Sequence, residues 1–201
     1  MKVFTWNQFC LNEKIARVDL TAFAKEITSR YDELPLKQEG EITVNIDGKE
    51  IKGTVETFWD ALNKSNAKLF KQIESRYHVE FVEEDPYETA EQMRKEVKES
   101  KILKIYKGDS EHPFFTEEEN WKFRAVHDYY THIIHGENFN LRGELRAYNT
   151  HSKLTPPMAL PALYTEVVGQ VCWAITNDGK FPTQKMAVVP GVDYREVGKT
   201  L

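Results

Sequence analysis

Residues 116–135 read TEEENWKFRAVHDYYTHIIH, and this stretch decides how the second half of the chain folds. Thr116 stands three residues before Glu119, which is the spacing of a capping box, in which each side chain accepts the other residue's backbone N–H. The acids that follow Thr116 are favourable at the positive end of a helix dipole, and Gly136 is a typical helix stop. The sequence therefore predicts a helix from Thr116 to His135.

Two further helices are predicted after this one. The first spans Arg142–Ser152 and stops before a Pro-Pro pair. The second spans Ala159–Ile175 and ends at the turn-forming residues 177–179. The apolar segment Lys185–Pro190 is expected to return as a strand or a buried strap.

The first half of the chain alternates between helical and strand patterns. Asp47-Gly48 is a tight-turn dipeptide between two alternating runs, which predicts a hairpin over Glu41–Val55. Asp85-Pro86 places an N-cap before a proline, which predicts the start of a helix that runs to Ser100. The remaining predictions are helices over Leu20–Leu34 and Glu56–Tyr77, and strands over His78–Val82 and Ile102–Tyr106.

These elements predict an α+β fold, with an N-terminal helix and hairpin part packed on a mainly helical C-terminal part. A chain of 201 residues that is 40% hydrophobic is long enough for one domain, residues 1–201. Within it we expect an α+β subdomain over about residues 1–107. A helical site region is expected over about residues 116–185.

The composition of the chain limits the kinds of partner and the location that are expected. The formal net charge is -5, so there is no basic excess to neutralise a phosphate backbone, and nucleic acid is not an expected partner. The apolar runs Met158–Leu163 and Val167–Ile175 are shorter than the roughly 20 residues of a membrane helix, so no span is expected. The N-terminus lacks a secretory apolar core, which favours an intracellular location or delivery by a non-secretory route. Cys10 and Cys172 fit reduced core thiols, with a single bridge between them left open.

Metal-capable side chains share a face of the helix predicted from Thr116. Asp128, His132 and His135 stand at i, i+4 and i+7, within two helical turns of one another. His127 points about one hundred degrees away from Asp128 in an α-helix. The side chains of Asp128, His132 and His135 are therefore expected to converge.

The next two helices carry similar pairs, since Glu144 and His151 are seven residues apart and Glu166 and Gln170 are four apart. Facing helices that project carboxylates and imidazoles into a shared interior can build a metal site, and such mixed ligands suit Zn, Mn or Fe. We therefore predict a divalent metal that activates water for hydrolysis. The predicted metal ligands are His127, Asp128, His132, Glu144, His151 and Glu166.

Hydrolysis at such a site also needs a general base and groups that hold the substrate. The predicted catalytic residues are His127, Asp128, Glu144 and Glu166. The predicted substrate-binding residues are Arg124, Arg146 and Gln170, which would hold a small anionic substrate such as a nucleotide or another phosphoester.

Two other interpretations of the same residues stay open. In the first, they form a buried hydrogen-bond network in which His127 or His132 pairs with Glu144 or Glu166, and His135 is simply exposed. In the second, a histidine–carboxylate pair is a general base without any metal. None of the standard metal-binding spacings is met, so the pattern alone does not choose among the three.

The dipeptide His127-Asp128 is similar to the one that gives the HD phosphohydrolases their name. That resemblance implies an upstream histidine ligand, for which His112 is the candidate. It also implies a distant aspartate ligand, for which Asp178 or Asp193 could serve.

A longer ordered pattern includes Phe123–Asp128, His132, Gly136, Phe139, Gly143-Glu144, Ala147, His151-Ser152, Thr165-Glu166, Gly169-Gln170, Trp173 and Gln184-Lys185. Over about residues 86–190 it resembles a domain carried by tailed-bacteriophage proteins, some of them large and multi-domain. The resemblance implies a phage or prophage product, located in the host cytoplasm or packaged in the virion. His135 has no counterpart in the pattern, which lowers it as a ligand.

Two hypotheses follow from the sequence. The leading one is a phage-encoded protein with a metal-dependent hydrolase site that acts on a nucleotide or other phosphoester. The alternative is a non-enzymatic virion component or host-defence inhibitor that binds a host protein, with the polar cluster only fixing the helices. Oligomeric state stays open in both.

Overall fold

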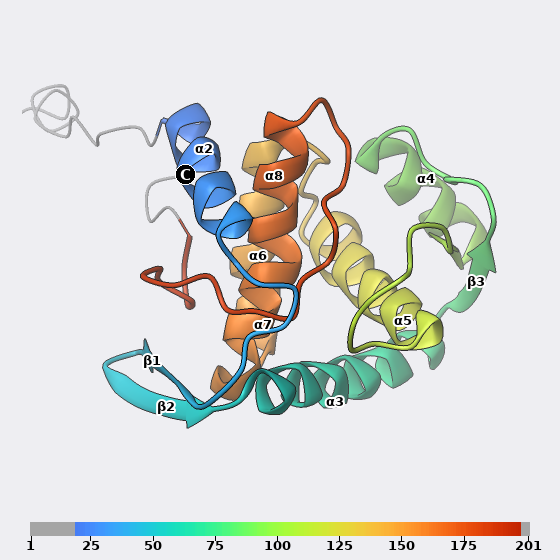
Figure 1. Ribbon diagram of the computed structural model, residues 1–201. Coiled ribbons are helices and arrows are strands. Elements are labelled where there is room, and N and C mark those ends of the chain that lie inside the picture. The colour runs from blue at the N-terminus through green and yellow to red at the C-terminus, as the bar shows by residue number, and fades with distance from the viewer. Residues whose placement is uncertain (1–18, 198–201) are drawn as a thin grey trace, which may run out of the picture.

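The computed structural model describes residues 19–197 and confirms the α+β class (Figure 1). The α-helices are α2 (Leu20–Asp32), α3 (Val55–Glu74), α4 (Ala90–Ser100), α5 (Glu117–His127), α6 (Leu141–Leu154), α7 (Leu160–Tyr164) and α8 (Gln170–Thr176). The strands are β1 (Ile42–Ile46), β2 (Lys49–Gly53), β3 (His78–Val82) and β4 (Ile102–Tyr106). Three short helices of other types are η1 (Asp128–Ile134), η2 (Pro157–Ala159) and η3 (Thr165–Gly169).

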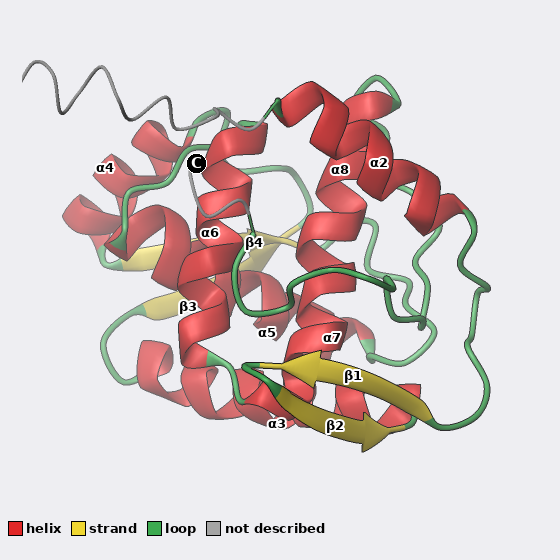
Figure 2. Cartoon of the chain, turned by 90° about the vertical axis from the view of Figure 1, so that its left-hand side faces the viewer, coloured by secondary structure: helices red, strands yellow, loops and turns green. Residues whose placement is uncertain are grey.

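The long helix α3 is the base on which the other elements are arranged (Figure 1). The β1–β2 hairpin precedes it at one end, and β3 with α4 follows it at the other. The α7–α8 rod and α6 stand above α3 between these two ends. Figure 2 shows that the β1–β2 and β3–β4 pairs lie in separate parts of the molecule.

The predicted hairpin forms at Asp47-Gly48. Both turn residues have positive φ, 54° for Asp47 and 75° for Gly48, which is the conformation that twists two strands together in a two-residue turn. The antiparallel register pairs Val44 with Ile51, and Val44 and Ile46 face the core. The alternation in the sequence thus gives one buried face to β1.

The strands β3 and β4 are parallel and are joined by α4, so this part of the chain is a β–α–β unit. Both strands have their predicted bounds. The prediction that a helix starts at Asp85-Pro86 is wrong. The helix α4 starts at Ala90, because the Thr89 hydroxyl accepts the Gln92 N–H as N-cap, while Asp85 accepts the Tyr87 N–H within a turn.

Two continuous helical runs of the C-terminal half each contain a π-helical segment. The capping box at Thr116 and Glu119 is confirmed, and α5 continues directly into the π-helix η1. The second rod runs through η2, α7, the π-helix η3 and α8, in place of the predicted helix Ala159–Ile175. Among residues 19–197 this rod, Pro157–Thr176, is the one helix long and apolar enough to cross a membrane, and 78% of its most apolar window is buried inside the protein.

Two hydrophobic clusters make the interior, and α5 belongs to both. Phe123 packs in the larger cluster, with the hairpin, α3, α6 and the α7–α8 rod. Val126 and Tyr129 pack in the smaller cluster, with α4, β3 and β4. The C-terminal end of α5, where the predicted ligands begin, therefore lies where the two clusters meet.

The segment Lys185–Pro190 is a buried strap, which is one of the two forms predicted for it. Met186 makes a parallel bridge to Lys37, with its N–H donated to Leu36 O at 2.8 Å. The strap holds the C-terminal part of the chain against the loop that follows α2. Cys172 on α8 is buried and unpaired, as predicted, and Cys10 lies outside the described residues.

Candidate metal centre

The π-helix η1 brings His127 and His132 together. A π-helical turn hydrogen-bonds residues five apart, so residues i and i+5 lie on one face of it. His127 Nε2 lies 3.2 Å from His132 Nε2. The prediction that His127 points away from Asp128 assumed α-helical geometry and is wrong, since ligand atoms of His127, Asp128 and His132 lie within 4.8 Å of one another. His135 lies at the end of η1 and is exposed.

Glu144 reaches the same two nitrogens from α6. Asn140 caps this helix by accepting the Gly143 N–H, which places Glu144 in the first turn, where an acid is favoured. Its carboxylate oxygens lie 3.3 Å from His127 Nε2 and 3.5 Å from His132 Nε2. Three of the predicted ligands therefore converge in space.

The tautomer of His132 follows from its other nitrogen. Nδ1 lies 3.0 Å from the backbone oxygen of Glu137, so Nδ1 carries the proton and donates it. Arg94 fixes that oxygen by donating to Glu137 O at 3.2 Å and to His132 O at 3.3 Å. His132 Nε2 consequently turns an unprotonated lone pair towards His127 and Glu144, as a metal-binding imidazole does.

Asp128 adds a second carboxylate beside the histidine pair. Its oxygen and the nitrogens of His127 and His132 lie within 4.8 Å of one another. Burial raises the pKa of Asp128 to about 7; the charge of His127 opposes this rise and that of Glu144 adds to it. We call His127, Asp128, His132 and Glu144 the histidine cluster.

The two histidines of the cluster respond differently to their surroundings. Burial and the charge of His127 lower the pKa of His132 to about 4. Burial also disfavours the charged form of His127, but its hydrogen bond to Glu144 and the charges of Glu144 and Asp128 outweigh that cost and raise its pKa. At neutral pH the cluster therefore holds one imidazole that is a ready lone-pair donor beside one that favours a proton or a cation.

His151 lies next to the cluster but outside it. Its ring centroid is 5.9 Å from that of His127, and its side chain is fully buried. Neither ring nitrogen has a hydrogen-bond partner within the described protein, and burial lowers the pKa of His151 to about 3. His151 is thus a neutral buried imidazole that borders His127.

Glu166 belongs to a different site. Its carboxylate accepts hydrogen bonds from Trp59 Nε1 at 2.9 Å and Gln170 Nε2 at 2.7 Å. His112 Nδ1 accepts the N–H groups of Phe114 and Phe115, so its Nε2 carries the proton and donates it to Glu166 at 2.9 Å. The structure therefore separates Glu166 from the other predicted ligands. We call Trp59, His112, Glu166 and Gln170 the Glu166 network.

Sequence reasoning missed Trp59 entirely and misjudged His112. No local pattern marks Trp59, because its partner Glu166 is 107 residues away along the chain. The HD resemblance implied His112 as a metal ligand, but both of its ring nitrogens are engaged elsewhere. Of the implied distant aspartates, Asp178 is exposed in the turn after α8, and Asp193 accepts the N–H groups of Arg195 and Glu196.

Two of the three predicted substrate-binding residues have structural roles. Arg124 donates to the backbone oxygens of Tyr106, Gly108 and Asp109, at 3.0, 2.6 and 2.7 Å, and so holds the loop after β4. Gln170 donates to Glu166. Arg146 is exposed on α6, two residues after Glu144.

A row of rings connects the Glu166 network with the histidine cluster. Neighbouring rings in it have centroids between 4.5 and 6.2 Å apart. The row ends at the exposed side of the cluster, where Phe139 meets the ring of His132 edge-on at 4.7 Å. Its members are His112, Phe115, Phe123, His151, His127, His132 and Phe139.

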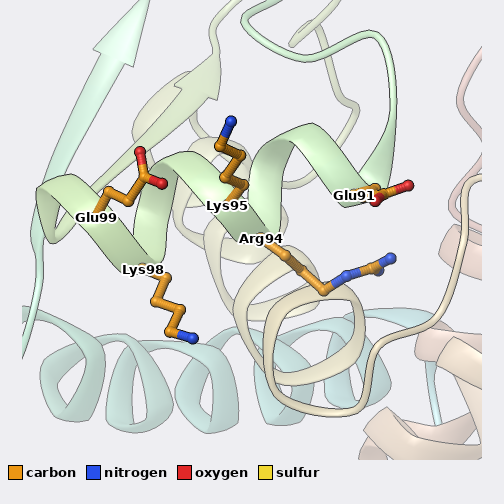
Figure 3. A pocket seen from close by; sticks show the side chains of 5 residues that line it. All are labelled: Glu91, Arg94, Lys95, Lys98 and Glu99. Carbon is orange, nitrogen blue, oxygen red and sulfur yellow. The ribbon is translucent and has the colours of Figure 1, made fainter.

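A shallow hollow on the outer face of α4 is a poor alternative site. Figure 3 shows that its side chains come from this one helix, so it is a solvated surface rather than a cleft between elements. Arg94 connects it to the cluster, through its hydrogen bonds to His132 O and Glu137 O. Its lining is Glu91, Arg94, Lys95, Lys98 and Glu99.

Comparisons with protein-family models, with curated proteins and with solved structures find no significant match to this chain. The resemblance to a tailed-phage domain over residues 86–190 therefore stays a prediction. The chemistry of the histidine cluster has to be derived from its own atoms.

Proposed function

We propose that the protein is a zinc-dependent hydrolase whose metal is held by His127, His132 and Glu144. The observation that carries this proposal is the spacing of three donor groups. The two Nε2 atoms lie 3.2 Å apart, and the Glu144 carboxylate lies 3.3 and 3.5 Å from them. Oε2 of Glu144 makes the shorter contact and Oε1 the longer one, so two imidazole nitrogens and one carboxylate face one another.

The donor types favour zinc. Mixed imidazole and carboxylate donors suit zinc, manganese or iron, the three metals that the sequence allows. The pairing of two histidines with one glutamate favours zinc among them.

Two histidines and a glutamate are a ligand set of hydrolytic zinc sites, which keep the fourth position for water. A bound zinc ion would supply water of lowered pKa there. The side chains of His127 and Glu144 are 12% and 14% exposed, so solvent reaches both of them. His132 is already oriented by Glu137 O, which reduces the reorganisation needed to bind a metal.

Asp128 is the candidate general base. A general base has to lie within reach of the water from which it takes a proton. The carboxylate of Asp128 lies beside both histidine nitrogens. Asp128 would accept a proton from the attacking water and release it to the leaving group.

The proposed substrate is a nucleotide or another phosphoester, the class that the sequence predicts. Arg124 and Gln170 bind protein groups in the structure, and Arg146 is the exposed member of the predicted set. The ordered resemblance over residues 86–190 supports the further proposal that the protein is a phage product. It would act in the host cytoplasm or be carried in the virion.

Zinc titration of chelator-treated protein tests this function. One zinc ion per chain is expected by calorimetry and by elemental analysis, together with zinc-dependent hydrolysis of a chromogenic phosphodiester such as bis(p-nitrophenyl) phosphate. The double variant His132→Ala, Glu144→Ala should lose both. The matched control His135→Ala, which changes an exposed histidine of the same segment, should keep both. A wild-type protein without stoichiometric zinc would rule the proposal out.

A second candidate function, binding of a host protein, is favoured by a groove between α3 and the turn after α6. Leu69, Leu154 and Met158 give it an apolar lining, and Leu154 is 40% exposed. Lys68 and Lys153 also line it, although the chain as a whole carries a charge of -5. The groove therefore suits an acidic amphipathic helix of a partner.

A labelled acidic amphipathic peptide tests this second function by fluorescence polarisation. Binding is expected, and the double variant Lys68→Glu, Lys153→Glu should abolish it without changing zinc binding. A peptide that does not bind, or that binds the charge-reversed variant equally well, contradicts it.

A further inference from the structure

We infer that His151 is a positioning residue of the zinc site, which holds the ring of His127 through one buried water molecule rather than binding the metal itself. The inference rests on the proposed function, since it assigns a role to a neighbour of the proposed ligands. Its basis is a pair of adjacent imidazoles whose nitrogens lack partners.

The unpaired atoms are concentrated at these two rings. Within residues 19–197, five buried side-chain polar atoms have no hydrogen-bond partner: both amide atoms of Asn66, Nδ1 of His127, and both ring nitrogens of His151. Buried polar atoms in native proteins are nearly always paired, with water where no protein group reaches them. Three of these five atoms therefore indicate an internal hydration site between His127 and His151.

The two rings lie within the reach of one bridging water. Their centroids are 5.9 Å apart with planes inclined at 47°, and no direct hydrogen bond joins them. Two hydrogen bonds of about 2.8–2.9 Å let one water bridge nitrogens up to about 5.5 Å apart. A single water can thus accept the N–H of His127 and donate to a ring nitrogen of His151.

The direction of His127 explains why His151 is not a ligand. Nε2 of His127 faces Glu144 and His132. Nδ1 is on the other side of the same ring, so a group that bonds to Nδ1 lies away from Glu144 and His132. Among residues 19–197, no hydrogen bond joins His151 to Glu144 or His132, and its other ring neighbour is Phe123, stacked at 6.1 Å.

The proposed bridge completes a pattern that His132 already shows. His132 donates its Nδ1 proton to Glu137 O, and its Nε2 lone pair is thereby directed into the cluster. His127 would donate its Nδ1 proton to the water held by His151, which directs its own Nε2 lone pair to the same point. Outer partners of this kind fix both the tautomer and the orientation of a ligating histidine.

The test is zinc affinity in His151→Phe, a variant that keeps a flat ring against Phe123 and removes both nitrogens. Zinc binding is expected to weaken about 10- to 100-fold, the usual effect of losing an outer partner. His151→Gln, which can still bind the water, should recover most of this loss. The visible spectrum of the cobalt-substituted protein should keep the shape of the wild-type spectrum in both variants, because the ligands are unchanged.

Three results would overturn the inference. Equal zinc affinity in wild type and His151→Phe removes the role of His151. A cobalt spectrum of different shape in His151→Phe makes His151 a ligand. If His151→Phe does not fold, nitrogen NMR of the zinc-bound wild type decides, since an unprotonated Nδ1 on His127 contradicts the bridge and a protonated one supports it. A wild type that binds no zinc overturns instead the proposed function on which the inference depends.

Discussion

Two carboxylates, Glu144 and Glu166, lie on packed helical segments, each beside a histidine, and yet they form opposite kinds of site. Glu166 accepts hydrogen bonds from three neutral donors, and its side chain is 3% exposed. Glu144 faces two histidine nitrogens and is 14% exposed. The first carboxylate is saturated by protein groups, whereas the second has room for a ligand.

The difference is set by the backbone group at Nδ1 of each histidine. His112 Nδ1 accepts two backbone N–H groups, which leaves its proton on Nε2 to be donated to Glu166. His132 Nδ1 donates to a backbone carbonyl, which leaves a lone pair on Nε2. The same pair of residue types thus gives a closed hydrogen bond in one place and an open metal-binding pair in the other.

Removing the saturated carboxylate should have the largest effect. In Glu166→Ala the N–H groups of Trp59, His112 and Gln170 lose their acceptor, and each buried unpaired donor costs about 1–3 kcal/mol. The free energy of unfolding in urea is therefore expected to fall by about 3–5 kcal/mol. Glu144→Ala is the matched control and should lose far less. A loss below about 1 kcal/mol in Glu166→Ala would show that Glu166 is not the centre of a structural network.

Changing the open carboxylate should affect metal binding instead. Glu144→Gln replaces a charged zinc ligand by a weakly binding amide of the same shape, so zinc affinity should fall more than about 100-fold, beyond the usual effect of an outer partner. The free energy of unfolding without metal should change by about 1 kcal/mol, because the amide oxygen that Glu144→Gln introduces can still accept the hydrogen bond of His127. Calorimetry with urea unfolding measures both. Zinc affinity equal to that of the wild type would remove Glu144 from the site.

Asp128 should make the stability of the folded protein depend on pH. Its pKa in the folded protein is about 7 against an ordinary value of 3.8, so between these values the folded state binds more protons than the unfolded state and stability falls as pH rises. Asp128→Asn removes this cost. We expect the metal-free variant to be more stable than wild type by about 1–2 kcal/mol at pH 8 and to show no gain near pH 4.

Urea unfolding at pH 4, 6 and 8 in the presence of a chelator measures this effect. Asp178→Asn is the control, because Asp178 is exposed and should give no pH-dependent difference. A constant difference between Asp128→Asn and wild type across the three pH values contradicts the assignment of Asp128 as a buried base.

The smallest effect is expected at Arg94, which acts two contacts away from the metal. Arg94→Ala frees the Glu137 carbonyl that orients His132, so zinc affinity should fall about 5- to 10-fold. Lys95→Ala, the neighbouring position on α4, should leave zinc affinity unchanged. Equal affinities in the two variants would mean that the loop after η1 holds His132 without Arg94.

The parts of the fold that sequence predicted are those whose determinants lie within a few residues. The turn at Asp47-Gly48 and the capping box at Thr116 are set by local backbone conformation and local hydrogen bonds, and both are confirmed. The prediction of where α4 starts is wrong because two possible N-cap residues lie within five residues of each other. Asp85 uses its side chain in a turn, and the hydroxyl of Thr89 caps the helix instead.

The candidate site was predicted in composition but not in geometry. An α-helical wheel places His127 away from His132. The π-helical turn that brings them together has no local pattern in the sequence that predicts it. Glu166 was grouped with Glu144 because helical spacing shows which residues share a helix face, but not which distant side chain fills the space opposite. Its partners Trp59 and His112 are 107 and 54 residues away.

The row of rings from His112 to Phe139 gives the two carboxylates a fixed separation. Flat rings packed face to edge or face to face have few rotamers and little compressibility, so the row is a rigid spacer inside the protein. Without it, Glu144 and Glu166 could draw the four imidazoles of the row into one shared network of neutral pairs. The spacer keeps the two polar centres independent, so substitutions in one could accumulate during evolution while the other keeps its geometry.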